Sequence, residues 1–224
     1  MRLLLSDDRV KVFTAGAFAE NGYVVRDADA GCAIIVDPGA CAEDQLAWLR
    51  ETGDRLDAIV LTHAHLDHVE GIPLVRSAWP DVPILLHDDD LPLYEGVPAQ
   101  GAMFGMDIEP LPVPTGRLEQ GEPVRCGGLA FQVRCAPGHA PGHVILVSVD
   151  LGLALTGDVV FLGSIGRTDL PGGDFHQLMD SIRREILGLP DEMRLLTGHG
   201  PETTVGHERA FNPFLVPQYR GHFA

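Results

Sequence analysis

The feature that most constrains this chain is a cluster of histidines placed directly behind an apolar run. Residues 56–61 are bounded by charge on one side and by histidines on the other, which is the pattern of a strand covered on both faces. Three of the ten histidines and one aspartate then fall within residues 62–68. A strand of this kind needs layers on both sides of its sheet, so we expect a layered α/β fold with ligating side chains at a strand end.

The spacing within this cluster predicts two metal sites. Residues two apart in an extended segment point the same way, so His63 and His65 can share one metal. Where the chain turns into the helix that follows, Asp67 and His68 point elsewhere and can bind a second metal. Imidazole and carboxylate groups are ligands of zinc and of other first-row metals. Four ligands do not fill two sites, so further ligands must come from other strand ends.

Three more segments place a candidate ligand after a predicted strand. His139, Asp158 and His199 each follow a glycine. Glycine permits tight or positive-φ turns, which let the next side chain point into a crowded centre. Residues 59–63 and 195–199 also echo each other, because both segments place a histidine just past a buried strand.

The rest of the chain alternates between strand and helix patterns. A helix that begins at the N-cap Asp174, with Gln177 three residues on, is the clearest local prediction. Strand, helix, strand, then hairpins, helix, strand and helix imply an α/β sandwich with helices outside the sheets. Strands are predicted at residues 10–13, 22–27, 33–36, 84–87 and 193–196 and in hairpins between 124 and 161, helices at 42–51, near 69–77 and after 204, helix or irregular structure at 91–100, and a loop at 103–122.

Composition excludes several classes of protein. A formal net charge of -16 would repel phosphate backbones, so we expect no nucleic-acid partner. The first residues hold an apolar run of only three leucines, too short for a signal peptide, and no stretch approaches the roughly 20 apolar residues of a membrane span. The four cysteines lack C-x-x-C spacing and are predicted to be buried free thiols. We therefore expect a cytoplasmic protein in which residues 1–224 form a single domain.

Taken together, these segments resemble the metallo-β-lactamase superfamily, and specifically its short glyoxalase-II-like hydrolases. The resemblance rests on residues 37–39, 62–68, 137–143, 156–158, 163–173, 198–201 and 212–215. It implies an αββα four-layer sandwich and two divalent metal ions, with zinc expected and iron or manganese also suitable. It assigns one metal to His63, His65 and His139, the other to Asp67, His68 and His199, and a bridging role to Asp158. Asp67 and Asp158 are thereby also the expected catalytic carboxylates.

The same resemblance implies hydrolysis of a small-molecule acyl-thioester such as S-D-lactoylglutathione. Two metals about 3.5–4 Å apart can share a hydroxide, which would attack the thioester carbonyl. Arg167 is a candidate contact for an anionic substrate group, although a salt bridge with one of the many acids is an equal alternative. Asp37 is expected to orient the site from behind, with a simple turn residue as the alternative. His143 is expected to orient a ligand or to pack behind it, with direct contact to metal or substrate as the alternative.

Two features keep other activities open. Long glyoxalase II enzymes carry a helical C-terminal domain that contacts glutathione, whereas little of this chain follows His199 and its only lysine is Lys11. Residues 166–169 also resemble persulfide dioxygenases of the same superfamily, which would use one iron held by His63, His139 and Asp158. A lactonase or a β-lactamase-like hydrolase would share the ligands of the thioesterase.

Overall fold

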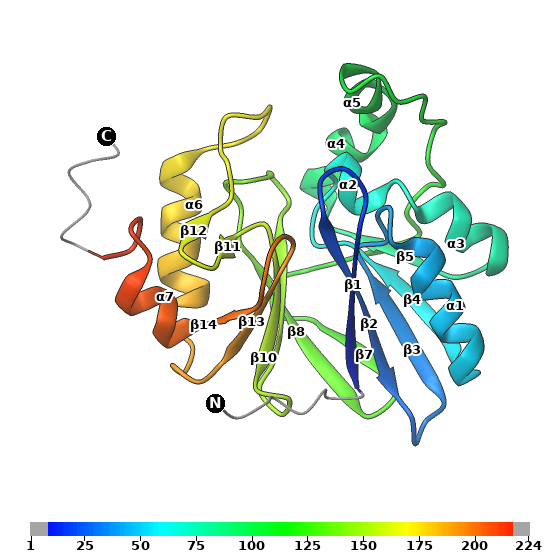
Figure 1. The fold of residues 1–224 in the computed structure, drawn as a ribbon, viewed down its shortest axis with the longest axis horizontal. Helices are drawn as coiled ribbons and strands as arrows, with labels where there is room; N and C mark the ends of the chain where they lie inside the picture. Colours follow the sequence, from blue (N-terminus) through cyan, green and yellow to red (C-terminus); the bar gives the residue numbers. More distant parts are fainter. Residues whose placement is uncertain (1–8, 217–224) are drawn as a thin grey trace.

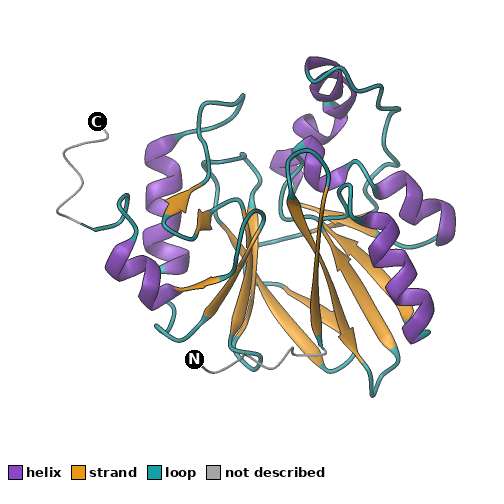
Figure 2. Ribbon diagram, in the orientation of Figure 1, coloured by secondary structure: helices purple, strands orange, loops and turns teal. Residues whose placement is uncertain are grey.

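The computed structural model describes residues 9–216, and the N-terminal segment on which the signal-peptide prediction rests lies outside this range. Two six-stranded sheets face each other, and helices cover the outer face of each (Figures 1 and 2). The first sheet has the order β1 (Val10–Ala15), β2 (Glu20–Asp27), β3 (Cys32–Val36), β4 (Arg55–Val60), β5 (Ile84–Leu86), β6 (Gly116–Arg117). The second has the order β14 (Thr203–Thr204), β13 (Arg194–Thr197), β10 (Leu153–Gly157), β9 (Val144–Ser148), β8 (Leu129–Cys135), β7 (Pro123–Cys126).

The helices divide between the two sheets. On the side of the first sheet lie α1 (Ala42–Thr52), α2 (Leu66–Val69), α3 (Ile72–Ala78), the short 3-10 turn η1 (Asp88–Asp90), α4 (Leu91–Glu95) and α5 (Val97–Met103). On the side of the second lie α6 (Phe175–Ser181), its π-helical continuation η2 (Ile182–Ile186) and α7 (Val205–Phe211). A two-stranded sheet of β11 (Val160–Phe161) and β12 (Ser164–Ile165) lies near α6.

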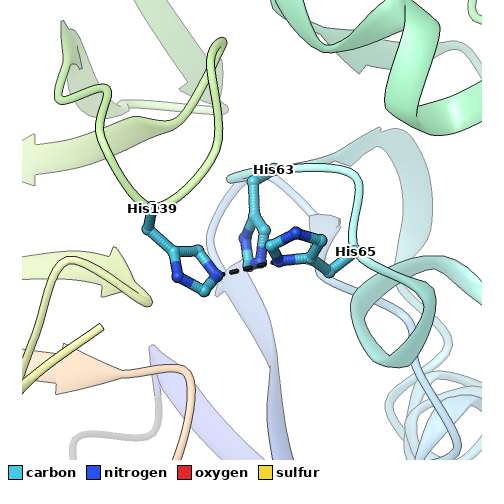
Figure 3. A group of neighbouring side chains, drawn as sticks. All are labelled: His63, His65 and His139. Atoms are coloured by element: carbon cyan, nitrogen blue, oxygen red, sulfur yellow. Dashed lines mark hydrogen bonds between the residues drawn. The ribbon is translucent and has the colours of Figure 1, made fainter. Parts of the chain in front are cut away.

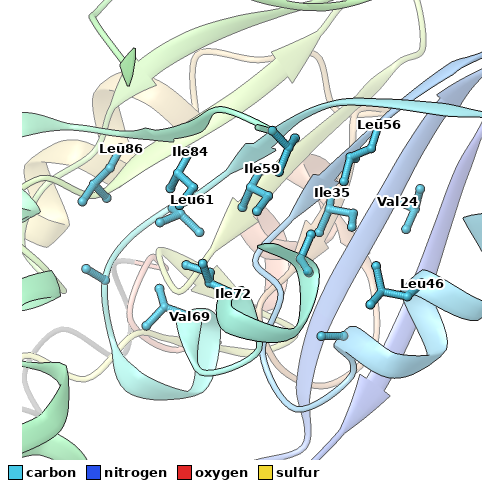
Figure 4. Packing of buried hydrophobic residues seen from close by; sticks show 14 of the residues in the cluster. Val24, Ile35, Leu46, Leu56, Ile59, Leu61, Val69, Ile72, Ile84 and Leu86 are labelled. Atoms are coloured by element: carbon cyan, nitrogen blue, oxygen red, sulfur yellow. The ribbon is translucent and has the colours of Figure 1, made fainter. Parts of the chain in front are cut away.

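Three separate apolar layers hold these parts together. Side chains on a strand alternate between faces, so Val24 and Ile35 pack under α1 and α3 while Val25 and Ile34 point into the space between the sheets. The first of these layers is drawn in Figure 4. A third layer packs the second sheet against α6 and α7. Three apolar layers between helix, sheet, sheet and helix confirm the predicted αββα sandwich.

Several local predictions need correction. The segment near residues 69–77 is two helices, because Gly71 interrupts it where its N–H donates to the Pro38 carbonyl. Residues 103–122 are not entirely a loop, since β6 adds a strand to the edge of the first sheet. Three cysteines are buried free thiols as predicted, but Cys135 is only half-buried. Within residues 9–216, no helix has the length and apolarity that a membrane span requires.

Candidate metal centre

The seven predicted ligands gather in the loops that follow strands of both sheets. His63 and His65 come directly after β4, and His68 lies with Asp67 in the short helix α2. The other three follow strands of the second sheet: His139 lies in the loop between β8 and β9, Asp158 follows β10, and His199 follows β13. Because the two sheets face each other, these loops meet at one edge of the sandwich.

The first group of candidate ligands is His63, His65 and His139. Each offers one ring nitrogen, and these nitrogens all lie within 4.8 Å of one another. The three rings converge on one point, and His65 Nδ1 lies 2.8 Å from His139 Nε2 (Figure 3). All three side chains are buried, so the residues packed around them fix their orientation.

The second group is Asp67, His68 and His199, whose ligand atoms also lie within 4.8 Å of one another. His199 Nε2 is 3.3 Å from Asp67 Oδ2, and His68 Nε2 is 3.9 Å from the same oxygen. Asp158 lies between the two groups. Its Oδ1 is 3.4 Å from His68 Nε2, while its Oδ2 is 3.4 Å from His199 Nε2 and 3.5 Å from His139 Nε2. A carboxylate that faces both groups in this way is suited to bridge two cations.

Hydrogen bonds to the far ring nitrogen fix the tautomer of the ligand histidines. His139 Nδ1–H donates to the carbonyl of Arg167 at 2.7 Å, and His199 Nδ1–H donates to the carbonyl of Phe18 at 3.0 Å. His68 Nδ1–H donates to Asp37 Oδ2 at 3.1 Å. A carbonyl or carboxylate oxygen only accepts, so in each ring Nδ1 carries a proton and Nε2 is the nitrogen that faces the site and can bind a metal.

The buried nitrogens and charges fit a pair of cations. Nε2 of His63 and of His68 is buried without a hydrogen-bond partner, which is costly unless a ligand completes it. Burial lowers the pKa of His65 to about 3, which keeps its imidazole neutral and able to bind metal. Burial also disfavours a charge on His199, yet hydrogen bonds to Asp158 and Asp67 raise its pKa to about 10. The two carboxylates thus attract positive charge, which divalent cations would supply.

The loops around this centre require glycine for two different reasons. Gly138 and Gly157 have φ values of 128° and 45°, so the residues before His139 and Asp158 adopt the positive-φ turns expected from the sequence. Gly198, which precedes His199, has ordinary φ, but a Cβ there would overlap Asp158 Oδ1. Gly166 is crowded in the same way, since its Cβ would overlap the Asp158 carbonyl.

Asp37 and His143 lie behind the ligands and contact them directly. Asp37 Oδ1 accepts from the Thr62 N–H at 2.7 Å, and Oδ2 accepts from the Thr62 hydroxyl at 2.6 Å as well as from His68. Both oxygens are therefore engaged, although Asp37 also lies within 4.8 Å of His63 and His68. His143 Nε2 accepts the Asp158 N–H at 3.0 Å, and its ring stacks on His63.

Arg167 lies at the edge of the site and is already paired. Its Nε and Nη2 donate to the two carboxylate oxygens of Asp169 at 2.7 and 2.9 Å. The side chain is 60% exposed, and it lines a pocket of about 350 Å³ that opens over both groups of ligands. The wall of this pocket is mainly apolar, and its apolar members are Phe18, Leu66, Phe104, Phe161, Ile165 and Leu170.

Sequence reasoning missed two buried acids near the site. Asp90 accepts from the N–H of Ala64 at 2.9 Å and of Gly142 at 2.6 Å, so it ties the first histidine loop to the loop that carries His139. Burial raises the pKa of Asp90 to about 6. Glu20 lies 3.9 Å from His68 Nδ1, and burial raises its pKa to about 9. Asp90 closely follows a strand and could have been a candidate, but nothing in the sequence separates it from its neighbours Asp88 and Asp89.

The fold and this arrangement of side chains define a class of protein. The sequence model of the metallo-beta-lactamase superfamily matches residues 15–199, and the chain belongs to that superfamily. It is 35% identical over 207 residues to hydroxyacylglutathione hydrolase GloC of Haemophilus influenzae (strain ATCC 51907 / DSM 11121 / KW20 / Rd), covering 92% of this chain and 97% of that protein.

Two solved structures are similar over almost their whole length. The structure of TTHA1623 in a di-iron-bound form is 42% identical, with a TM-score of 0.83, and the match covers 92% of this chain and 100% of that one. The BLEG-1 B3 metallo-beta-lactamase is 35% identical, with a TM-score of 0.85, and the match covers 92% of this chain and 99% of that one. The relatives thus bear names from more than one kind of hydrolase, so family membership alone does not define the substrate.

Proposed function

We propose that this metal-dependent hydrolase is a cytoplasmic thioesterase that cleaves small-molecule acyl-thioesters such as S-D-lactoylglutathione. The observation that carries the proposal is the pair of ligand groups, each with three donors, that share Asp158. The name of the relative GloC supports this class of substrate. A thioester suits the site chemically, because a thiolate leaves readily without a strong general acid.

In this proposal each group of residues has a separate task. His63, His65 and His139 would hold one divalent ion, Asp67, His68 and His199 would hold the other, and Asp158 would contact both. When bound, such a pair of ions lowers the pKa of water towards 7 and polarises a carbonyl. The chain itself positions the ligands through their Nδ1 hydrogen bonds and excludes water from one side of the substrate with its apolar wall.

Zinc is the proposed metal, and iron is the principal alternative because one similar protein was solved in a di-iron-bound form. Mixed histidine and carboxylate sites accept both metals, so availability in the host decides between them. Metal analysis of protein purified from its own host measures the identity and the number of ions. Two ions per chain is the expected result, and a chain that is fully active with none would contradict the proposal.

A steady-state assay tests the activity. Protein loaded with zinc is compared with His63→Ala on S-D-lactoylglutathione and on other acyl-thioesters. His207 is exposed on α7, and His207→Ala serves as the matched control that should retain full activity. Turnover by the wild type and by His207→Ala, with loss in His63→Ala, is the expected result. Turnover no higher than that of His63→Ala would contradict the thioesterase.

A persulfide dioxygenase remains the alternative, because its expected ligands also lie together. Asp158 Oδ2 is 3.5 Å from His139 Nε2, and His63 belongs to the same group. That activity would require one iron per chain and oxygen uptake with glutathione persulfide. The thioesterase proposal expects no oxygen uptake with this substrate.

A further inference from the structure

Two aromatic side chains from separate elements meet at the mouth of the pocket. Phe18 lies in the loop between β1 and β2, and Phe104 follows α5. Their rings pack edge to face, with centroids 5.1 Å apart and planes at 82°. Phe18 is 36% exposed and Phe104 is 58% exposed, although both rings line the pocket over the candidate metal centre. Large apolar side chains left exposed at a site are typical of a surface that a ligand covers.

The loop that carries Phe18 is held in place by the candidate metal centre itself. The Phe18 carbonyl accepts from His199 Nδ1–H at 3.0 Å, so its position is coupled to a ligand histidine. The next residue, Ala19, has a φ of 51°, a left-handed conformation that is costly for alanine. The Phe18 ring is therefore positioned by the hairpin turn and by the bond of its carbonyl to His199.

The side chains that line the pocket offer an anionic substrate group little positive charge of their own. Asp67 and Asp158, at its base, would be balanced by the metals that they hold. Among the described residues that line the pocket, Arg167 is the only arginine or lysine. Its guanidinium donates two hydrogen bonds to the carboxylate of Asp169. The glutathione moiety carries two carboxylates, and the pocket lining offers them a single guanidinium, which already pairs with Asp169.

We propose that the Phe18–Phe104 pair is a specificity wall that selects thioesters with an apolar group, aromatic or of medium chain length, next to the scissile bond. This inference rests on the proposed thioesterase function and names its substrate class. A hexanoyl or phenylacetyl thioester of a neutral thiol is then a better substrate than S-D-lactoylglutathione, whose acyl group is small and hydroxylated. The apolar group covers the two rings and removes them from water.

A series of thioesters tests the wall. One arm keeps the neutral thiol N-acetylcysteamine and varies the acyl group from acetyl to hexanoyl and phenylacetyl. The other arm keeps the acetyl group and lengthens an apolar thiol, and kcat/KM should change less along this arm than along the acyl series. Hexanoyl has four more methylenes than acetyl, and a fully buried methylene is worth up to about fourfold. Burial against two rings that remain partly exposed is only partial, so kcat/KM should rise on the order of tenfold.

Variants of the wall should remove this gain selectively. Phe18→Ala keeps the main-chain carbonyl that His199 uses, and Phe104→Ala touches no ligand. Each should reduce the gain from acetyl to hexanoyl to about threefold or less. Phe211, exposed on α7 outside the pocket, gives the matched control Phe211→Ala, which should keep the full gain. A wild type without the gain, a gain that survives in the double variant of Phe18 and Phe104, or a preference for S-D-lactoylglutathione would each overturn the inference.

Binding of the product acids separates this inference from the thioesterase. Calorimetric titration measures the dissociation constants of acetate and hexanoate without any turnover. Hexanoate should bind about tenfold more tightly than acetate to the wild type, and the difference should fall to about threefold or less in Phe18→Ala. If this result is obtained while no thioester is hydrolysed, apolar recognition by Phe18 and Phe104 is supported and the proposed thioesterase activity is contradicted. Equal binding of the two acids to the wild type would overturn the wall even if thioesters are cleaved.

Discussion

At the scale of single residues, the orientation of His68 depends on one carboxylate. Asp37 accepts three hydrogen bonds, two from Thr62 and one from His68 Nδ1–H, and it does so at a φ of 50°. Asn tolerates this backbone conformation, so Asp37→Asn should fold normally. The amide nitrogen of the new asparagine would face one of the three donors. The negative charge that attracts the Nδ1 proton of His68 would also be lost. We expect the affinity for the metals to fall by about 10- to 100-fold.

Metal titration followed by calorimetry measures this affinity. Asp29 lies exposed in the turn after β2, so Asp29→Asn makes the same chemical change away from the site. It should leave the affinity unchanged. An unchanged affinity in Asp37→Asn as well would mean that Asp37 is only a turn residue.

Gly198 shows how closely the main chain approaches the candidate ligands. A Cβ at this position would overlap Asp158 Oδ1 and would lie 2.9 Å from His68 Cε1. Gly198→Ala should therefore displace Asp158 and reduce kcat/KM on a thioester by about 100-fold, the usual cost of a displacement of about 1 Å. Gly128→Ala is the control, because its Cβ would meet only Asp27 Oδ2 at 3.4 Å. Equal activity of the two variants would show that Asp158 can move without consequence.

At the scale of elements, a buried ion pair fixes β2 to the start of β4. Arg26 Nε lies 2.6 Å from Asp54 Oδ2, and the Asp54 side chain is 4% exposed. The hydrogen bond from Arg26 lowers the pKa of Asp54 below its usual value. A carboxyl with a lowered folded-state pKa stabilises the fold above the unfolded pKa of about 3.9, and this stability is lost as the pH falls through the folded value.

Asp54→Asn should therefore reduce the free energy of unfolding by about 2 kcal/mol at pH 7, the order expected for a hydrogen bond to a charged group. The difference from the wild type should shrink as the pH falls from 4 to 3, which urea denaturation at each pH measures. Asp57 offers a matched control, since Arg55 Nε lies 2.6 Å from its Oδ1 but the Arg55 side chain is 69% exposed. Asp57→Asn should cost less than about 1 kcal/mol. Equal costs for both variants would contradict the role of burial.

The elements also show what the sequence could and could not predict. Strand ends and ligand spacing are local patterns, so the positions of His63, His139 and His199 after buried strands followed from the sequence. The break between α2 and α3 did not, because the apolar spacing continues through Gly71 and only the nearby carbonyl of Pro38 ends the helix. Asp90 was missed because its role also depends on the tertiary structure. It hydrogen-bonds two loops that are distant in sequence.

At the scale of the whole molecule, the candidate metal centre lies outside the three apolar layers. Each layer consists of apolar side chains and includes none of the seven candidate ligands, so the chain should keep its fold when the metals are removed. The metals would nevertheless stabilise the fold, because they bind the assembled loops and not the unfolded chain. The loops come from both sheets, so bound ions would also join the two halves of the sandwich.

Chelation should therefore lower the Tm without unfolding the protein. A metal present at 1,000 times its Kd adds about 4 kcal/mol, and each kcal/mol shifts the Tm by about 2–4 °C for a chain of this size, which gives a fall of about 8–16 °C. Calorimetry with and without chelator measures the shift, and circular dichroism checks that the helices and sheets remain. His63→Ala should show a much smaller shift, whereas His207→Ala should match the wild type. A wild type whose Tm does not change on complete removal of the metals would show that the seven side chains converge without joining the two sheets through a cation, and the fold would then owe its stability to the apolar layers alone.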